Sequence, residues 1–214
     1  MSTLKYAVVG LMLGALVSLG LFGGGSIVSL EEQTRTFAAL LLPSSVDYEP
    51  ATGPRDLAKR SELVALGRIG GFSEGRSYGE SPDLIWHETA VMQIIVDEVL
   101  AGELPDPDHR SLYFELPIDS LSSVKALGDA APTEARVLVY AVVMAAPQES
   151  IVSNGRGMPP GQLLLEFTTP QGFLVDVGDG VFAGLPDPNS AVKRNVDLND
   201  YAPPRDAWPH PHEP

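Results

Sequence analysis

The chain has 214 residues, a net charge of −14 and no cysteine, and 44% of its residues are hydrophobic. This length allows one domain or two small ones, and the hydrophobic fraction is enough for a packed core. The lack of cysteine excludes disulfides, a thiol nucleophile and thiolate metal sites. The acidic balance disfavours nucleic acid and anionic lipid headgroups and is compatible with cationic partners.

The N-terminal segment is a candidate membrane anchor. Residues 6–30 carry no charged side chain, and Lys5 precedes them. About 20 apolar residues span a bilayer, so this run is long enough. One interpretation is a single-pass anchor with the N-terminus cytoplasmic and the rest outside. The others are a signal peptide cleaved near Ser26, which would give a secreted protein, and a buried soluble helix. The run is long for a signal peptide and lacks an Ala-x-Ala site, which favours the anchor.

Residues 31–60 are expected to form a spacer that contains a short helix. The apolar segment 37–42 either extends the anchor helix or lies on the folded domain. Residues 54–60 are predicted to form one or two helical turns. Pro54 suits the first turn, and Thr52 is the candidate cap.

A β domain is expected over residues 61–186, and its central strand is the clearest element. Every second residue from Ala90 to Val96 is apolar, while polar residues such as Thr89 and Gln93 alternate with them. This period of two is typical of a strand with one face in a core. Gly102 and the proline after it end the strand.

Shorter strands are predicted on both sides of the central one. A loop over residues 70–79 follows the first of them, a short helix is expected near residues 122–127, and Gly178-Asp179-Gly180 predicts a hairpin turn. The run over 137–144 is apolar on both faces, which indicates a strand buried on both sides. The expected strands cover residues 62–69, 111–116, 137–144, 163–167 and 173–177, with another from 181.

Six or seven short strands separated by turn signals favour a mainly β fold, a small antiparallel OB-like barrel or sandwich. The order of four segments carries a resemblance, and these segments are residues 61–69, 96–102, 136–140 and 172–175. This order resembles the OB-like barrels of tissue-inhibitor and netrin-module domains and of many exported bacterial proteins. The inhibitors use an N-terminal cysteine to chelate a protease metal, and this chain has none. The resemblance therefore implies a fold and no activity.

Residues 187–214 form a proline-rich tail.

Catalytic signatures are absent from the sequence, including Gly-x-Ser-x-Gly, His-Glu-x-x-His and the Walker loop. In an extended segment His87 and Glu88 point to opposite faces, so they are poorly placed as a dyad. Trp86 beside them is expected to plug the rim of the barrel. His109 lies in a turn rich in Pro and Asp and is expected to be solvated. No catalytic residue or cofactor is predicted.

Metal sites are not expected either. Asp176, Asp179 and Asp187 lie among glycines, but their spacing matches no calcium loop, which needs six to eight oxygens. His210 and His212 could bind a transition metal weakly. They supply only two ligands, so they are expected to belong to an extended tail.

The expected contact surface is the loop over 70–79 with its flank, where Arg68, Phe72, Arg76 and Tyr78 would meet a partner. These features lead to the hypothesis of a membrane-tethered extracytoplasmic β domain that binds or braces another protein. One alternative is an accessory subunit of a larger membrane complex. The other is a carboxylate-dependent hydrolase, with an acid/base pair drawn from four candidates. These candidates are Glu98, Glu115, Asp176 and Asp179.

Overall fold

The computed structural model describes residues 29–41, 51–118, 122–146, 150–155, 161–176 and 182–184. Three α-helices occur in these ranges: α1 (Leu30–Leu41), α2 (Pro54–Arg60) and α3 (Ser122–Ala130). A 3₁₀ turn, η1 (Pro170–Gly172), separates two of the strands. The strands are β1 (Leu63–Ser81), β2 (Leu84–Ala101), β3 (Ser111–Ile118), β4 (Val137–Val143), β5 (Ile151–Ser153), β6 (Leu164–Phe167), β7 (Phe173–Asp176) and β8 (Phe182–Gly184).

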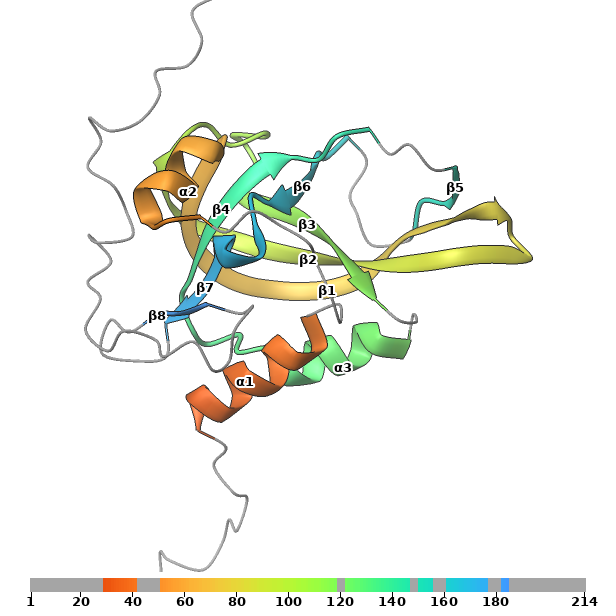
Figure 1. Ribbon diagram of the computed structural model, residues 1–214, viewed down its shortest axis with the longest axis horizontal. Coiled ribbons are helices and arrows are strands. Elements are labelled where there is room, and N and C mark those ends of the chain that lie inside the picture. Colours follow the sequence, from red (N-terminus) through yellow and green to blue (C-terminus); the bar gives the residue numbers. More distant parts are fainter. Residues whose placement is uncertain are drawn as a thin grey trace, which may run out of the picture.

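Five of the strands form a ring (Figure 1). Strands β1, β2 and β3 pair antiparallel in sequence order. Strand β6 joins β3 in parallel and β4 in antiparallel orientation. Strand β4 returns to β1 through the register Leu63↔Ala141 to Gly67↔Val137, which closes the ring. The fold-class prediction is confirmed in its coarser form: the protein is mainly β and its sheet closes in part on itself.

The two longest strands form one extended hairpin, and the prediction of a loop over residues 70–79 is wrong. Strand β1 continues to Ser81 and pairs with β2 along this whole length. The pairing skips a residue between Ile69 and Gly71 and shifts again after Glu74. Glycines in a strand often mark β-bulges, which bend a strand without ending it. The glycines of this segment therefore accommodate bends and close backbone contacts within a strand.

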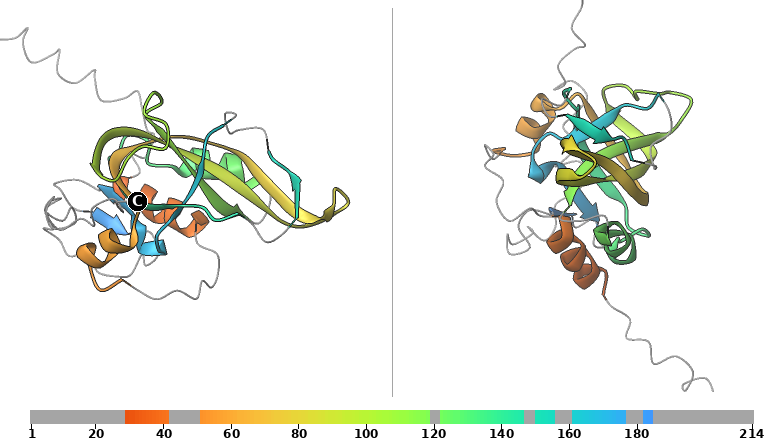
Figure 2. Two further views of the ribbon diagram at one scale, coloured as in Figure 1. Left: turned by 90° about the horizontal axis from the view of Figure 1, so that it is seen from above. Right: turned by 90° about the vertical axis from the view of Figure 1, so that its right-hand side faces the viewer.

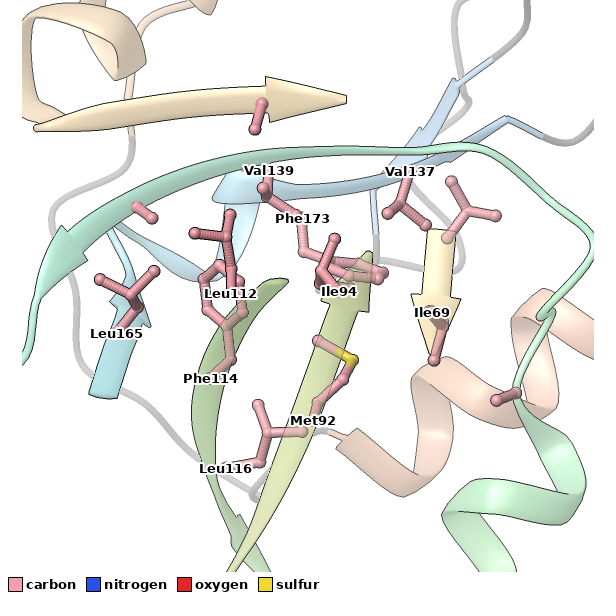
Figure 3. Packing of buried hydrophobic residues seen from close by; sticks show 14 of the residues in the cluster. Ile69, Met92, Ile94, Leu112, Phe114, Leu116, Val137, Val139, Leu165 and Phe173 are labelled. Atoms are coloured by element: carbon pink, nitrogen blue, oxygen red, sulfur yellow. The ribbon is translucent and has the colours of Figure 1, made fainter. Parts of the chain in front are cut away.

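The main core fills the interior of the ring. Apolar side chains at alternate positions point inward from the strands (Figure 3). The predicted alternation in β2 and β3 is confirmed, because Met92 and Phe114 are fully buried. Helices α1 and α3 lie side by side and cover one side of this core (Figure 1). Phe37 of α1 is fully buried and lies edge-on to Phe72, with ring centroids 5.7 Å apart. Of the two alternatives for segment 37–42, its described part therefore lies on the domain.

A second, smaller core lies on the outer face of β1 and β4. Leu138 and Tyr140 of β4 point away from the ring interior and pack with Leu57 of helix α2. Val137 and Val139 point into the main core, so the prediction that this strand is buried on both faces is confirmed. The predicted helix over residues 54–60 is confirmed as well.

Thr52 is not the cap of α2. The N-cap is Gly53, which makes no side-chain cap bond. The backbone N–H of Thr52 instead donates to Asp56 Oδ2 at 2.9 Å. This bond runs from the backbone before the helix to a carboxylate in its first turn, the reverse of the bond that a capping side chain makes.

The C-terminal half contains the predicted elements and one strand that was not predicted. The strands predicted near residues 163–167 and 173–177 and the helix near 122–127 are present. The antiparallel pairing of β7 with β8 confirms the hairpin predicted around the Gly-Asp-Gly turn, although the turn itself lies outside the described residues. Strand β5 was not predicted, because its sequence lies in a segment rich in Ser, Asn, Gly and Pro.

Residues 1–28 of the anchor or signal segment lie outside the described residues, as does the tail 187–214, while its last residue, Leu30, begins helix α1. Among the residues that are described, no helix has the length and apolar character to cross a bilayer.

Candidate functional site

A buried ion pair joins the hairpin to the ring. Arg76 of β1 donates from Nε to Glu115 Oε1 at 2.8 Å, and its Nη2 donates to Oε2. The side chain of Glu115 is only 1% exposed and that of Arg76 is 13% exposed. Two parallel N–H···O bonds from a guanidinium to a carboxylate fix the relative orientation of both groups. The pair therefore fixes this part of β1 against β3.

Two hydroxyl groups complete the environment of Glu115. Tyr78 Oη donates to Oε2 at 3.0 Å, and Thr89 Oγ1 lies 2.8 Å from Oε1. Thr89 Oγ1 is also 3.0 Å from the carbonyl oxygen of Arg76, so its single hydrogen can serve either acceptor. Each carboxylate oxygen of Glu115 thus has two hydrogen-bonding neighbours. We call Arg76, Tyr78, Thr89 and Glu115 the buried polar cluster.

Arg76 makes further contacts that extend this cluster. Its Nη2 lies 2.9 Å from the sulfur of Met144, just after β4. Its guanidinium carbon is 5.4 Å from the centre of the Tyr78 ring, a cation–π distance. The Tyr78 ring in turn stacks on His87 of β2, with centroids 4.6 Å apart. The cluster thus connects β1, β2 and β3 to the end of β4.

The electrostatics favour a pair that is charged at neutral pH. Burial alone raises the pKa of Glu115, but hydrogen bonds from Arg76, Thr89 and Tyr78 and the charge of Arg76 outweigh it. The net result is a pKa of Glu115 below its usual value. The hydrogen bond to Glu115 likewise raises the pKa of Arg76, against the smaller effect of burial. A carboxylate held ionised with both oxygens occupied is poorly suited to act as a general acid or base.

The lowered pKa of Glu115 predicts a loss of stability in acid. A group with a lowered folded pKa contributes its full stabilisation above the unfolded value, about 4.3 for Glu. That stabilisation declines as the pH falls below about 4.3 and through the lower folded pKa. We expect wild type to lose more unfolding free energy than Glu115→Gln between neutral and about pH 3 in urea titrations. Asp56 and Asp106 also have lowered pKa values because they accept hydrogen bonds. Both residues are present in wild type and in Glu115→Gln, so their contribution cancels when the two proteins are compared. Equal losses in the two proteins would contradict this assignment.

Beyond the cluster the hairpin continues as an arm, which we define as residues 77–88. Strand β4 pairs with β1 only as far as Gly67, and strand β3 pairs with β2 only as far as Glu88. Apart from the pair Glu88↔Ile118 at its base, β5 is the one described strand that accompanies the arm, through the pairs Ser77↔Ser153 and Tyr78↔Ile151. Two views show the arm extending past the ring (Figures 1 and 2).

A close backbone contact holds β5 and the residues after it against β1. Gly155 has a φ of +68°, and a Cβ there would lie 2.2 Å from the carbonyl oxygen of Gly75. Only glycine accepts both the left-handed conformation and this contact. Strand β5 is thereby fixed along the base of the arm.

Substitution of Gly155 by alanine is expected to release this segment. Strain of about 1–3 kcal/mol is typical of a left-handed non-glycine residue in a tight site. We expect faster hydrogen exchange at the amides of β5 in Gly155→Ala, measured by mass spectrometry. Gly161→Ala is the matched control, because Gly161 also has a positive φ, +84°, but has nothing within 4 Å of its added Cβ. If both variants exchange alike, the contact with Gly75 does not hold β5.

The end of the arm is apolar and exposed. Leu84, Ile85 and Trp86 are consecutive and are 48%, 41% and 55% exposed. We call these three residues the tip. Ile151 of the accompanying strand β5 is also exposed. Leu84 and Trp86 share one face of the strand and Ile85 lies on the other, so the end of the arm exposes apolar groups on both faces. Exposed apolar surface that is contiguous marks interaction sites more often than isolated residues do. The expectation that Trp86 plugs the rim of the barrel is wrong, because the strand carries it beyond the ring.

The four residues of the predicted contact surface lie in three different places. Arg68 is exposed on β1, with Nη2 3.6 Å from Asp97 Oδ2 across the strand pair. Phe72 is half-buried and packs against the main core. Arg76 and Tyr78 belong to the buried polar cluster. The structure therefore does not bring the four together on one surface.

The carboxylates of the hydrolase hypothesis lie on different strands. Glu98 is exposed on β2, Glu115 is buried beside Arg76, and Asp176 is at the end of β7. Asp179 and Asp187 fall outside the described residues, as do His210 and His212. His109 is exposed, and its Nδ1 lies 2.9 Å from Asp106 Oδ2. Within the described ranges no group of three or more His, Asp or Glu residues could hold a metal ion.

Sequence reasoning missed two features of this region. Glu115 was one of several carboxylates, and its position between the core residues Phe114 and Leu116 places it on the opposite face of the strand, so no local signal indicated its burial. Arg76 is 39 residues away in the chain, so its pairing could not be inferred locally. The apolar tip could have been detected from Leu84-Ile85-Trp86 directly after Pro82-Asp83.

Comparison with known proteins adds no relative to this description: no family model matches the chain, and neither the curated proteins nor the solved structures contain a significant match.

Proposed function

We propose that this chain is a membrane-tethered extracytoplasmic binding module that contacts another protein through the tip of its arm. The observation that carries the proposal is the exposure of Leu84, Ile85 and Trp86 on a hairpin that extends beyond the ring. Tryptophan is among the residues that contribute most to protein–protein binding energy. Its placement at the end of a projecting element favours contact with a partner over a role in folding.

Preorganisation of the arm supports the same function. A flexible loop loses conformational entropy when it binds, whereas a braced element has already lost it on folding. The arm is fixed at its base by the bonds of Arg76 and Tyr78 to Glu115 and along its edge by β5. A braced and projecting apolar element therefore favours a binding role.

The finer fold that we propose is an OB-like barrel. An OB-fold is a five-stranded, partly open Greek-key barrel. The ring order β1-β2-β3-β6-β4, with a parallel β3–β6 pair, is consistent with it, as is the position of α3 between β3 and β4. Other OB-folds bind oligonucleotides, but the net charge of −14 disfavours such ligands here.

The tether that we propose is the uncharged segment 6–30, with the N-terminus on the cytoplasmic side. Helix α1 begins at Leu30, so the folded domain would lie close to the membrane. Intact-mass measurement of the protein from membranes should give a chain that retains residues 1–30, allowing for loss of Met1. A mature start near Ser26 would make the protein secreted and would leave the tip hypothesis unaffected.

Site-specific photo-crosslinking tests the contact directly. A benzophenone amino acid at position 86 of the full chain should give a discrete protein adduct in cells. The same group at position 98, which is exposed on the ring part of β2, is the control and should not give it. We expect Leu84→Ser/Ile85→Ser to reduce the adduct at least tenfold while thermal stability is retained, because both side chains are exposed.

Two outcomes would overturn the proposal. One is the same set of adducts from positions 86 and 98, which would indicate random collision. The other is an adduct unaffected by the double serine substitution. Stoichiometric co-purification of an uncrosslinked partner with the chain in detergent would instead identify the chain as an accessory subunit of a membrane complex.

A further inference from the structure

The charges around the tip indicate what kind of partner it would accept, an inference that rests on the proposed function. Residues 77–88 contain three acidic residues, Glu80, Asp83 and Glu88, and no lysine or arginine. Glu80 and Asp83 are exposed in or beside the turn that precedes the tip. Glu74, nearer the base of the arm, is exposed as well. The apolar tip is therefore bordered by negative charge.

The buried polar cluster increases this asymmetry. Arg76 is the nearest arginine to the arm in the sequence, but its charge is directed into the protein and paired with Glu115. Its side chain is 13% exposed, so it contributes little positive potential at the surface. The exposed carboxylates of Glu80 and Asp83 are thus not balanced by Arg76.

We propose that the tip binds a protein segment that is apolar at its centre and carries lysine or arginine around it. Acidic groups at the rim of an interface attract a cationic partner, raise the association rate and make binding sensitive to salt. A second copy of the same chain is the poorer occupant, because tip-to-tip contact would bring together like charges on two chains of net charge −14. An anionic bilayer is disfavoured for the same reason.

The fluorescence of Trp86 offers a direct test in the full chain. The sequence has two tryptophans, so Trp208→Phe leaves Trp86 as the sole reporter. The chain is placed in liposomes of zwitterionic lipid and titrated with two synthetic tryptophan-free peptides. Both have the same leucine positions, and the remaining positions are all lysine in one and all glutamate in the other.

We expect the lysine peptide to shift the Trp86 emission to the blue and to bind at least tenfold more tightly than the glutamate peptide. Raising the salt concentration from about 50 to about 500 mM should weaken the binding of the lysine peptide at least tenfold. Glu80→Gln/Asp83→Asn should reduce both the affinity and the salt dependence, while Ile85→Ser should reduce the affinity and leave the salt dependence.

The other outcomes separate the charge preference of the tip from the proposed binding function. Equal affinity for both peptides, with loss of binding in Ile85→Ser, would overturn the charge preference and leave the tip as a binding surface. Failure of the lysine peptide to bind would also overturn the charge preference, and crosslinking at position 86 would then decide the proposed function alone. Quenching of Trp86 by brominated lipid would show that the tip enters the bilayer, which overturns both.

Discussion

Replacing Arg76 by methionine is expected to lower the free energy of unfolding by about 3–5 kcal/mol. Removing one partner of a buried ion pair leaves the other charge buried and uncompensated, and losses of this size are typical. Glu115 is 1% exposed, so water cannot replace the guanidinium without local opening. Urea denaturation at neutral pH measures the effect. Arg68→Met is the matched control, because its pair with Asp97 is exposed on both sides and should contribute less than about 1 kcal/mol.

The double variant Arg76→Met/Glu115→Leu separates charge burial from packing. Apolar replacements of a buried pair are often close to neutral. We therefore expect the double variant to be more stable than Arg76→Met alone, although Tyr78 Oη would lose its bond to Glu115. If Arg76→Met costs no more than Arg68→Met, or if the second substitution adds a further loss, the ion pair is not the interaction that stabilises the base of the arm.

The second large effect is expected at Phe37 on helix α1. Phe37→Ala should cost about 3–5 kcal/mol, the usual range for removing a buried phenylalanine. The side chain is fully buried and its ring lies near those of Phe72 and Phe173, with centroids at 5.7 and 6.4 Å. Thermal and urea unfolding of the full chain measure this loss. A large effect would establish that α1 is part of the folded domain and not a spacer.

Leu40→Ala provides the control within the same helix. Leu40 is 40% exposed, and alanine is the best helix former, so this substitution should change stability by about 0.5 kcal/mol or less. A small effect of Phe37→Ala, similar to that of Leu40→Ala, would show that α1 detaches from the ring in solution.

The local sequence pattern predicted the strands in which the burial of side chains follows a regular order along the chain. Alternation in β2 and β3 follows directly from one face packing in the core, as Met92 and Phe114 show. The continuous apolar run of β4 arises because Leu138 packs under α2 while Val139 faces the ring interior. Such strands are recognisable because each position reports its own environment.

Long-range pairing could not be predicted in the same way. Closure of the ring depends on β1 meeting β4 and on the parallel β3–β6 pair, between segments far apart in the chain. Their register is set by the packing of the whole core and not by any local motif. Glycines such as Gly75, which lies too close to Thr89 to carry a side chain, indicate a loop by composition yet belong to a bent strand.

The candidate site was the least predictable part for a related reason. The sequence pattern places Arg76 in an exposed loop, yet its charge is buried because Glu115, on a different strand, supplies the opposite charge. Glu115 lies 39 residues further along the chain, and Arg76 can be buried because this carboxylate pairs with it. The exposure of Trp86 depends in turn on the length by which the hairpin exceeds the ring.

The arm is expected to be a rigid element held at a fixed angle to the ring by the buried polar cluster. Because the chain has no cysteine, a pair of spin labels can be introduced without removing native residues. Labels at Asp83→Cys beside the tip and Glu134→Cys, an exposed residue after α3, report the position of the arm relative to the body. Double electron–electron resonance should give one narrow distance distribution for the otherwise wild-type chain. A broad or multi-peaked distribution would contradict the account, because it would show that the buried polar cluster does not fix the arm.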